Sequence, residues 1–220
     1  MSKVLVVAAH PDDEVLGIAG TVMKHIEEGD EARCLIAATG MAAREDDKDK
    51  IKRLHAKTLE AAKIIGYRDV KFLDFPDNKM DSLPLLDIIQ PIEKVIDDFM
   101  PDVIYTHFEN DLNIDHRLCY QAIITACRPI GGYAPKIYTF EVLSSTEWQR
   151  STAGTFVPTT YVDIEKYMDR KLKALLVYDT EVREYPFPRC PEGLNILAGY
   201  RGLESGLKFA EALQLVREIR

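Results

Sequence analysis

The chain has 220 residues, of which 46% are hydrophobic and 29% are charged. These values are ordinary for a globular protein, and the length allows one domain with a real core but argues against a second full domain. The formal net charge of -8 argues against a nucleic-acid partner, and the absence of any apolar run long enough to cross a bilayer argues against a membrane protein.

The first predicted strand begins at Lys3, which leaves no room for a signal peptide, so we expect a cytoplasmic protein. The four cysteines show no C-x-x-C spacing and sit singly among apolar or mixed neighbours. We interpret them as reduced packing residues rather than metal ligands or disulfides.

Short apolar runs alternate with segments of helical spacing through the first two thirds of the chain. They predict strands at residues 3–7, 31–39, 69–75, 102–106 and 136–142, with helices between them. This alternation is typical of an α/β fold with a parallel sheet. Pro91 is expected to kink or split the helix predicted over residues 82–100.

The alternation breaks down after residue 142. We therefore expect one domain over residues 1–220, with a core over about 1–142 and a C-terminal appendage over about 143–220. In the appendage a helix is predicted within residues 161–178 and a last helix over about 203–217, with leucine, alanine and valine on one face. Three prolines within residues 185–191 exclude regular structure there.

The sequence A-H-P-D-D-E at residues 9–14 follows the first strand and enters a helix. In a parallel α/β sheet this loop lies at the carboxyl edge, where such folds place their sites. Its carboxylates would repel a phosphate and attract a cation. We predict that His10 and Asp13 bind one metal ion and that Asp12 acts as a base. The alternative is an acidic first turn that only complements the helix dipole.

A second polar loop, residues 106–117, enters another helix at the same edge of the sheet. Asp115 is a credible N-cap, which would hold His116 rigidly in the first turn, and we favour His116 as a metal ligand. His107 is either a core histidine bonded to the backbone or part of the site. His25 and His55 are isolated, and we expect them at the edge or in solvent.

The sequence resembles the LmbE / PIG-L family of metal-dependent N-acetyl-sugar deacetylases over nearly its whole length. The resemblance is carried by A-H-P-D-D-E at residues 9–14 and D-H at residues 115–116. Arg44 after the second strand and F-P-D-N at residues 75–78 are weaker matches. The runs S-S-T-E-W at 144–148 and Y-R-G-L-E-S-G at 200–206 resemble a bacterial branch of the family.

The resemblance implies a Rossmann-like three-layer sandwich with a mostly parallel sheet and a small C-terminal appendage. It also implies one zinc ion (Zn2+) per chain, held by His10, Asp13 and His116, with Asp12 as general base. Arg44 and Asp77 would contact sugar hydroxyls. The substrate would be a small N-acetylated sugar or sugar conjugate. Because members of the family often assemble in multiples of three, the resemblance also implies a homo-oligomer, such as a trimer or hexamer.

Many family members carry a histidine two residues before the aspartate of the D-H pair, where this chain has Asn113. Asn113 can donate a hydrogen bond to an oxyanion but cannot give up a proton. Protonation of the leaving amine is therefore expected from His107 or from Asp12 after it has taken a proton.

The chemistry of these residues agrees with removal of an acetyl group, because two imidazoles and one carboxylate leave zinc an open position. Arg44, Arg189 and Arg201 are candidates for binding an anionic group on the substrate, or are ordinary surface arginines. Two other functions stay open. One is a different metal hydrolase, such as a phosphoesterase or amidase. The other is a non-catalytic Rossmann-like binding module.

Overall fold

The computed structural model describes residues 1–42, 48–149 and 154–220. Seven strands form one sheet: β1 (Lys3–Ala8), β2 (Glu31–Ala42), β3 (Asp69–Asp77), β4 (Val103–His107), β5 (Lys136–Phe140), β6 (Thr160–Asp163) and β7 (Ala210–Arg217). The longer helices are α1 (Asp13–Glu27), α2 (Lys48–Ile65), α3 (Leu85–Phe99), α4 (Ile114–Ala126), α5 (Met168–Val177) and α6 (Pro191–Ser205). Three short 3-10 helices, η1 (Met80–Ser82), η2 (Thr146–Trp148) and η3 (Glu165–Tyr167), lie in connecting segments.

The strand order is β3-β2-β1-β4-β5-β7-β6. Strands β1 to β5 pair in parallel, and β7 pairs antiparallel with both β5 and β6. The chain moves outward on one side of β1 through β2 and β3, and then returns to β4 on the other side. The carboxyl ends of β1 and β4 therefore flank the crevice where open α/β sheets bind ligands.

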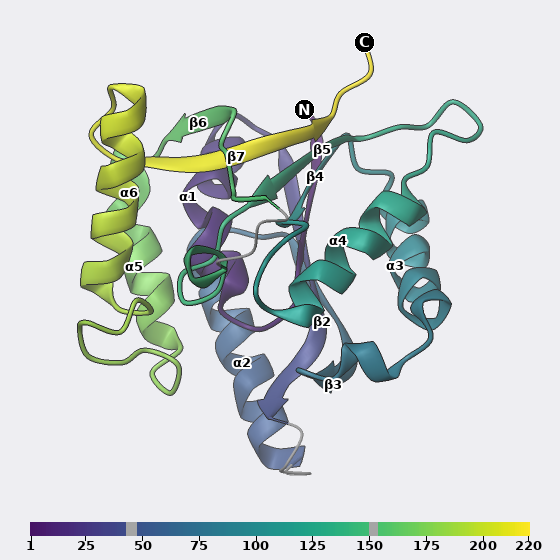
Figure 1. Ribbon diagram of the computed structural model, residues 1–220, viewed down its shortest axis with the longest axis horizontal. Helices are drawn as coiled ribbons and strands as arrows, with labels where there is room; N and C mark the ends of the chain where they lie inside the picture. Colours follow the sequence, from purple (N-terminus) through teal and green to yellow (C-terminus); the bar gives the residue numbers. More distant parts are fainter. Residues whose placement is uncertain (43–47, 150–153) are drawn as a thin grey trace.

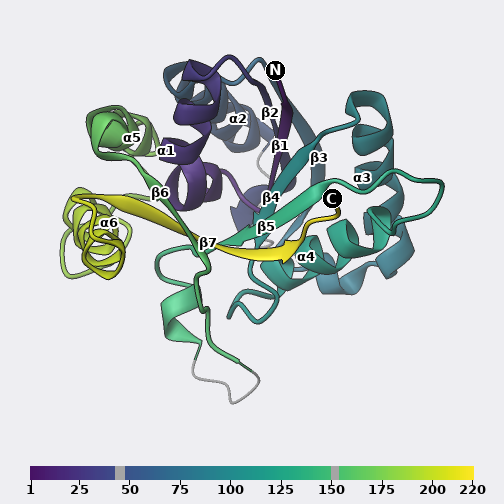
Figure 2. The same cartoon turned by 90° about the horizontal axis from the view of Figure 1, so that it is seen from above.

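Helices cover both faces of the sheet, which makes three layers (Figures 1 and 2). One face packs against α1, α2, α5 and α6, and the other packs against α3 and α4. Alternate residues of β1 enter the two cores, with Val4 and Val6 in one and Leu5 and Val7 in the other. The structure confirms the predicted Rossmann-like three-layer α/β class with a mostly parallel sheet. Among the described residues, no helix combines the length and the apolar character needed to cross a bilayer.

Helix α3 runs through Pro91 without a break, so a split of the helix is wrong, while the predicted alternative of a kink stays a prediction. Proline removes only one amide donor from the helix. Six residues of α3, among them Ile88, Ile92 and Phe99, are buried against the sheet and α4. Tertiary packing of this apolar face outweighs the lost hydrogen bond.

The last helix predicted over residues 203–217 is wrong. Helix α6 ends at Ser205, Gly206 follows with φ of 74°, and residues Ala210–Arg217 form β7. An eight-residue run is too short for its apolar spacing to distinguish a helix from a strand. The open edge of β5 decides the outcome, because β7 satisfies its main-chain groups there and also pairs with β6.

Side chains of α5 and β7 hold the main chain of α1. The carboxylate of Glu211 accepts hydrogen bonds from the amides of Gly20 (2.8 Å) and Thr21 (2.6 Å). Lys171 donates to Glu211 (2.6 Å) and to the carbonyl oxygen of Leu16 (2.9 Å). Both charged side chains are 4% exposed. The C-terminal segment therefore fixes the helix whose first turn carries Asp13.

Replacement of Glu211 by Gln is expected to lower the free energy of unfolding by about 3 kcal/mol or more, because it leaves the Lys171 ammonium buried without its counter-charge. Chemical denaturation measures this change. The matched control is Glu165→Gln, which breaks the exposed Lys208–Glu165 pair and is expected to have little effect on the free energy of unfolding. Equal losses in the two variants would contradict the interpretation.

Candidate metal centre

The loop between β1 and α1 gives the neighbouring residues Asp12 and Asp13 different roles, since Asp12 is the N-cap and Asp13 the first residue of α1. Asp12 has φ of 102°, a left-handed conformation that aspartate tolerates better than most residues. Its carbonyl oxygen accepts the first hydrogen bonds of α1, from the amides of Val15 and Leu16 (both 2.9 Å). Asp13, the first helical residue, accepts instead from the amide of His10 (2.9 Å). The two neighbouring carboxylates thus enter different surroundings.

Helix α4 begins differently from the prediction. Its N-cap is Asn113, whose side-chain oxygen accepts from the amide of Asp115 (2.8 Å), so the prediction of Asp115 as the cap is wrong. Asp115 already lies in the first helical turn, and its carboxylate accepts from the amides of Asn78 (2.7 Å) and Met80 (3.1 Å). This contact ties the segment after β3 to the site.

His10, Asp13 and His116 come together at the crevice between β1 and β4. Their nearest ligand atoms lie within 4.8 Å of one another, and all three residues are buried. Asp13 Oδ2 lies 3.3 Å from His10 Nδ1 and 3.2 Å from His116 Nε2. Within the described part of the chain, His116 Nε2 and Asp13 Oδ1 make no hydrogen bond. The group could hold a metal ion, and these unsatisfied buried atoms fit that use.

Each histidine of the group is oriented by carboxylates on its other nitrogen. His10 Nε2 lies 3.0 Å from Asp115 Oδ2 and 3.1 Å from Asp77 Oδ1. His116 Nδ1 lies 3.1 Å from Asp111 Oδ1. Such carboxylate–histidine pairs fix the ring and its tautomer at metal sites. The sequence analysis did not identify Asp111, although its place in the polar loop before α4 was a possible signal.

Asp111 is itself held by the segment after β5. The hydroxyls of Ser145 and Thr146 both donate to it, the latter at 2.6 Å. Burial acts to raise the pKa of Asp111, but the contact with His116 and its charge, together with the two hydroxyl donors, lower it to about 2. Asp111 therefore stays ionised beside His116.

The charges of the group also fit a bound cation. Burial acts to raise the pKa of Asp13, but the neighbouring His116 and His10 hold it well below its usual value. Burial acts to lower the pKa of His10, but contacts with Asp115, Asp13 and Asp77 raise it well above 6.5. The buried carboxylates therefore lie next to groups that favour positive charge, and a divalent metal ion could supply that charge.

A second set of possible ligand atoms consists of His10, Asp77 and Asp115. Both oxygens of Asp115 already accept main-chain hydrogen bonds, and Asp77 Oδ1 accepts from Asn78 Nδ2 (3.1 Å) as well as facing His10. We interpret this set as the support of the His10 ring rather than as a second metal site.

Asp12 lies beside the metal group and makes a separate contact. It is 1% exposed, and its Oδ2 accepts a hydrogen bond from Arg189 Nη1 (2.8 Å). Its Oδ1 is buried and has no hydrogen-bond partner among the described residues. Burial raises the pKa of Asp12 to about 7, and the positive charge of Arg189 opposes this rise. A pKa near neutrality suits a general base.

His107 Nε2 and the side chain of Asn113 are engaged in contacts within the protein. His107 Nε2 accepts from the amide of Ala9 (2.8 Å), and its ring stacks on His116 with centroids 3.8 Å apart. Burial and the neighbouring His116 hold the pKa of His107 well below 6.5, so it is neutral. Asn113 Nδ2 donates to Asn78 Oδ1 (3.0 Å), in addition to the capping contact.

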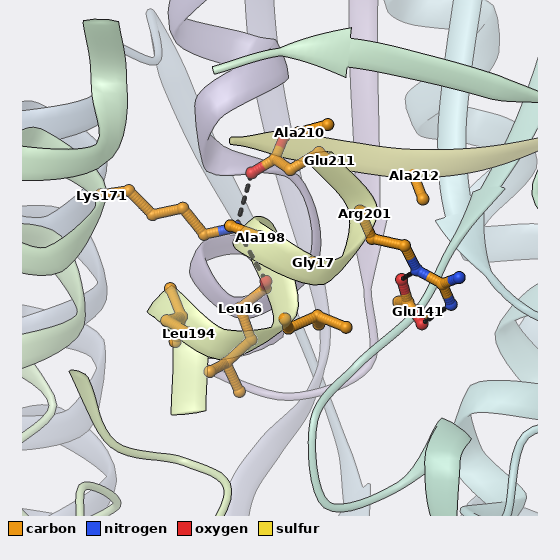
Figure 3. A pocket seen from close by; sticks show the side chains of 11 residues that line it. Leu16, Gly17, Glu141, Lys171, Leu194, Ala198, Arg201, Ala210, Glu211 and Ala212 are labelled. Atoms are coloured by element: carbon orange, nitrogen blue, oxygen red, sulfur yellow. Dashed lines mark hydrogen bonds and ion pairs between the residues drawn. The ribbon is translucent and has the colours of Figure 1, made fainter. Parts of the chain in front are cut away.

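The residues predicted to bind substrate are placed in different surroundings. The carboxylate of Asp77 contacts the imidazole of His10, and the guanidinium of Arg189 donates a hydrogen bond to Asp12. Arg44 lies outside the described residues. Arg201 makes a two-pronged contact with Glu141 (both 2.7 Å). Both residues line a cavity of about 20 Å³, and the Lys171–Glu211 pair lines it as well (Figure 3). The guanidinium of Arg201 donates hydrogen bonds to Glu141 and Glu204, and its role as a substrate contact stays a prediction.

A cleft of about 750 Å³ adjoins the metal centre. Asp77 and Asn78 line it from the end of β3, Arg53 and Lys57 line it from α2, and Glu181 lines it from the segment after α5. Its volume is in the range of small-molecule sites, and its lining is polar and charged. The sequence analysis did not identify the α2 residues or Glu181 as members of the site.

Replacement of His116 by Ala is expected to abolish tight metal binding, because it removes one of the three candidate ligands. Replacement of Asp111 by Asn should lower the affinity only about 10- to 100-fold, as is usual when the partner of a liganding histidine is lost. The control is His55→Ala, since His55 stacks on Phe72 and carries none of the proposed ligand atoms. Titration of the metal-free protein with zinc measures all three, and unchanged binding in His116→Ala would contradict the ligand set.

Glu14 is expected to make the stability of the metal-free protein pH-dependent. Burial and the neighbouring Asp12 raise its pKa from 4.5 to about 8, although Tyr178 donates to it (2.5 Å). The folded state therefore keeps a proton that the unfolded state releases above about pH 4.5, so stability falls as the pH rises toward 8. Unfolding free energies measured between about pH 5 and 8 should fall less steeply for Glu14→Gln than for wild type. Parallel curves would contradict this assignment.

Comparison with known proteins agrees with these features. The family model described as PIG-L: GlcNAc-PI de-N-acetylase matches residues 5–127. The chain is 32% identical over 178 residues to the uncharacterized deacetylase YaiS of Escherichia coli (strain K12), covering 78% of this chain and 88% of that protein. It is 25% identical over 229 residues to a diacetylchitobiose deacetylase of Thermococcus kodakarensis, covering 98% and 84% of the two chains.

Two solved structures share the fold. The N,N'-diacetylchitobiose deacetylase of Pyrococcus horikoshii has a TM-score of 0.79 and 21% identity, and the match covers 98% of this chain and 84% of that one. GalB, the 4-carboxy-2-hydroxymuconate hydratase of Pseudomonas putida KT2440, has a TM-score of 0.78 and 22% identity, with 100% and 98% covered. The fold alone therefore does not determine the reaction. The family match includes the whole His10, Asp13 and His116 group and more than half of the sequence, and the chain belongs to the PIG-L family of de-N-acetylases.

Proposed function

We propose that this protein is a zinc-dependent hydrolase that removes the acetyl group from an N-acetylated amino sugar. The observation that carries the proposal is the buried group of His10, Asp13 and His116 beside Asp12, whose Oδ1 has no partner among the described residues. A metal group next to a free carboxylate oxygen suits the hydrolysis of an amide by water, because the metal polarises the carbonyl and the carboxylate takes the proton of the water.

Two imidazole nitrogens and one carboxylate oxygen are the usual protein ligands of a catalytic zinc site with an open position. Zinc bound there would supply a Lewis acid that brings the pKa of water to about 7 and polarises an amide carbonyl. His10 and His116 would each offer one nitrogen to the metal, while the other nitrogen faces the carboxylate of Asp115 or Asp111, which orients the ring.

Asp12 does the proton transfer in this proposal. Its Oδ1 takes a proton from the attacking water, and the same carboxyl group then delivers that proton to the leaving amine. We assign the second step to Asp12 because His107 uses Nε2 to accept from Ala9, and Asn113 has no proton to give. A single residue can serve both steps when its pKa lies near neutrality.

The similarity to a diacetylchitobiose deacetylase supports an N-acetylglucosamine-type substrate. The cleft of about 750 Å³ has room for one or two sugar rings. Asp77 borders both His10 and this cleft, so we propose that its carboxylate accepts a hydrogen bond from a sugar hydroxyl.

The direct test is to incubate the zinc-loaded protein with N-acetylglucosamine, N,N'-diacetylchitobiose and anionic N-acetylglucosamine conjugates, and to assay the released acetate and free amine. We expect release from at least one of them and none after chelation of the metal. Acetate release that persists without metal, or its absence from every N-acetylated sugar, would contradict the proposal.

Replacement of Asp12 by Asn is expected to lower kcat by about 10²- to 10⁴-fold while the zinc content stays at one per chain. Asparagine has a similar shape and tolerates the left-handed backbone, but it cannot take a proton. Steady-state kinetics and elemental analysis of the same preparation measure the two quantities. Wild-type turnover with zinc bound would exclude Asp12 as the base.

A further inference from the structure

We propose that Arg189 is a positioning residue for Asp12: its guanidinium holds Oδ2 of the carboxylate and so presents Oδ1 to the water and substrate. This inference rests on the proposed function, because it assigns a role within the same site. It differs from the prediction that Arg189 binds the substrate.

The contact between the two side chains is direct and largely buried. Arg189 Nη1 donates to Asp12 Oδ2 at 2.8 Å, and the side chains are 19% and 1% exposed. A hydrogen bond between two charged groups is shorter and stronger than a neutral one, and burial strengthens it further. The contact therefore has the geometry to fix the carboxylate.

The guanidinium is itself held from a second side. Arg189 Nε donates to Ser144 Oγ at 2.6 Å and to the carbonyl oxygen of Leu143 at 3.3 Å. Ser144 is held in turn, because its amide donates to Glu147 Oε1 at 2.5 Å. Arg189 thus bridges the segment after β5 and the loop after β1, and its position does not depend on Asp12 alone.

The backbone of Asp12 leaves only its side chain to be fixed. Its amide donates to Glu14 Oε2 at 3.0 Å, and its carbonyl oxygen accepts two hydrogen bonds from α1. The remaining freedom is rotation of the carboxylate about its side-chain bonds. Arg189 engages one oxygen, and the other is the buried Oδ1 without a partner in the described ranges.

A buried carboxylate oxygen without a partner is costly, and native proteins rarely keep one without a function. Both oxygens belong to the same carboxylate: Arg189 binds Oδ2, and Oδ1 is left available for the reaction. Misplacement of a reacting group by about 1 Å can lower the rate about 10²-fold. The expected effect of losing Arg189 therefore falls on kcat.

The test compares Arg189→Ala, Arg189→Lys and the control Arg183→Ala in the zinc-loaded protein. Arg183 lies in the same segment, but its guanidinium packs over the ring of Phe187 (4.7 Å). We expect Arg189→Ala to lower kcat about 10- to 100-fold with KM changed less than about threefold. Arg189→Lys, which keeps one donor, should lose less, and added guanidinium ion should partly restore Arg189→Ala. Arg183→Ala should retain wild-type kinetics.

Zinc content and the thermal midpoint are measured on every variant, so that loss of the site or of the fold is detected. If Arg189→Ala does not fold, Arg189→Lys decides, and a wild-type kcat in that variant overturns the proposal. A loss confined to KM also overturns it, because it identifies Arg189 as a substrate contact. Absence of acetate release by the wild type would instead refute the proposed function. A crystal structure of the Arg189 variant that folds then tests the positioning role. An Asp12 carboxylate in its wild-type position would refute that role.

Discussion

The contact of the Asp13 carboxylate with the imidazoles of His10 and His116 is the interaction on which the site depends. A carboxylate buried among other carboxylates is unstable unless positive charge lies next to it. Here two nitrogens face the carboxylate at 3.2 and 3.3 Å, and a metal ion supplies the compensating charge in the function we propose. The other site contacts orient the two rings or separate Asp12 from this group.

The sheet topology brings these groups together, and the C-terminal segment keeps them in place. The crevice lies where the chain leaves β1 in one direction and β4 in the other, so two loops about a hundred residues apart meet at one edge. Lys171 and Glu211 hold α1 after Asp13, and Arg189 holds the side chain of Asp12 in the loop before α1. The region expected to be an appendage thus supports the site through buried charged contacts.

Local sequence patterns predicted the elements whose signal is repeated over a long segment. The five parallel strands and the helices between them follow from alternating apolar runs, and the structure has them all. Besides the split expected at Pro91, two predictions that rested on a few residues were wrong. The cap of α4 is Asn113 rather than Asp115, two residues away, and Ala210–Arg217 pairs as a strand with β5. In both cases several local choices were equally compatible with the sequence, and partners from distant segments selected one.

The sequence by itself determined the α/β class, the candidate metal ligands at residues 10, 13 and 116, and the presence of a second carboxylate at Asp12. These properties follow from residue chemistry and from the rule that parallel strands end at one edge. Only the tertiary structure decided which oxygen of Asp12 is free, that Asp111 faces His116, and that Arg201 pairs with Glu141. The physical reason is that the partner of a charged side chain is set by packing between segments far apart in the chain, and no local periodicity encodes it.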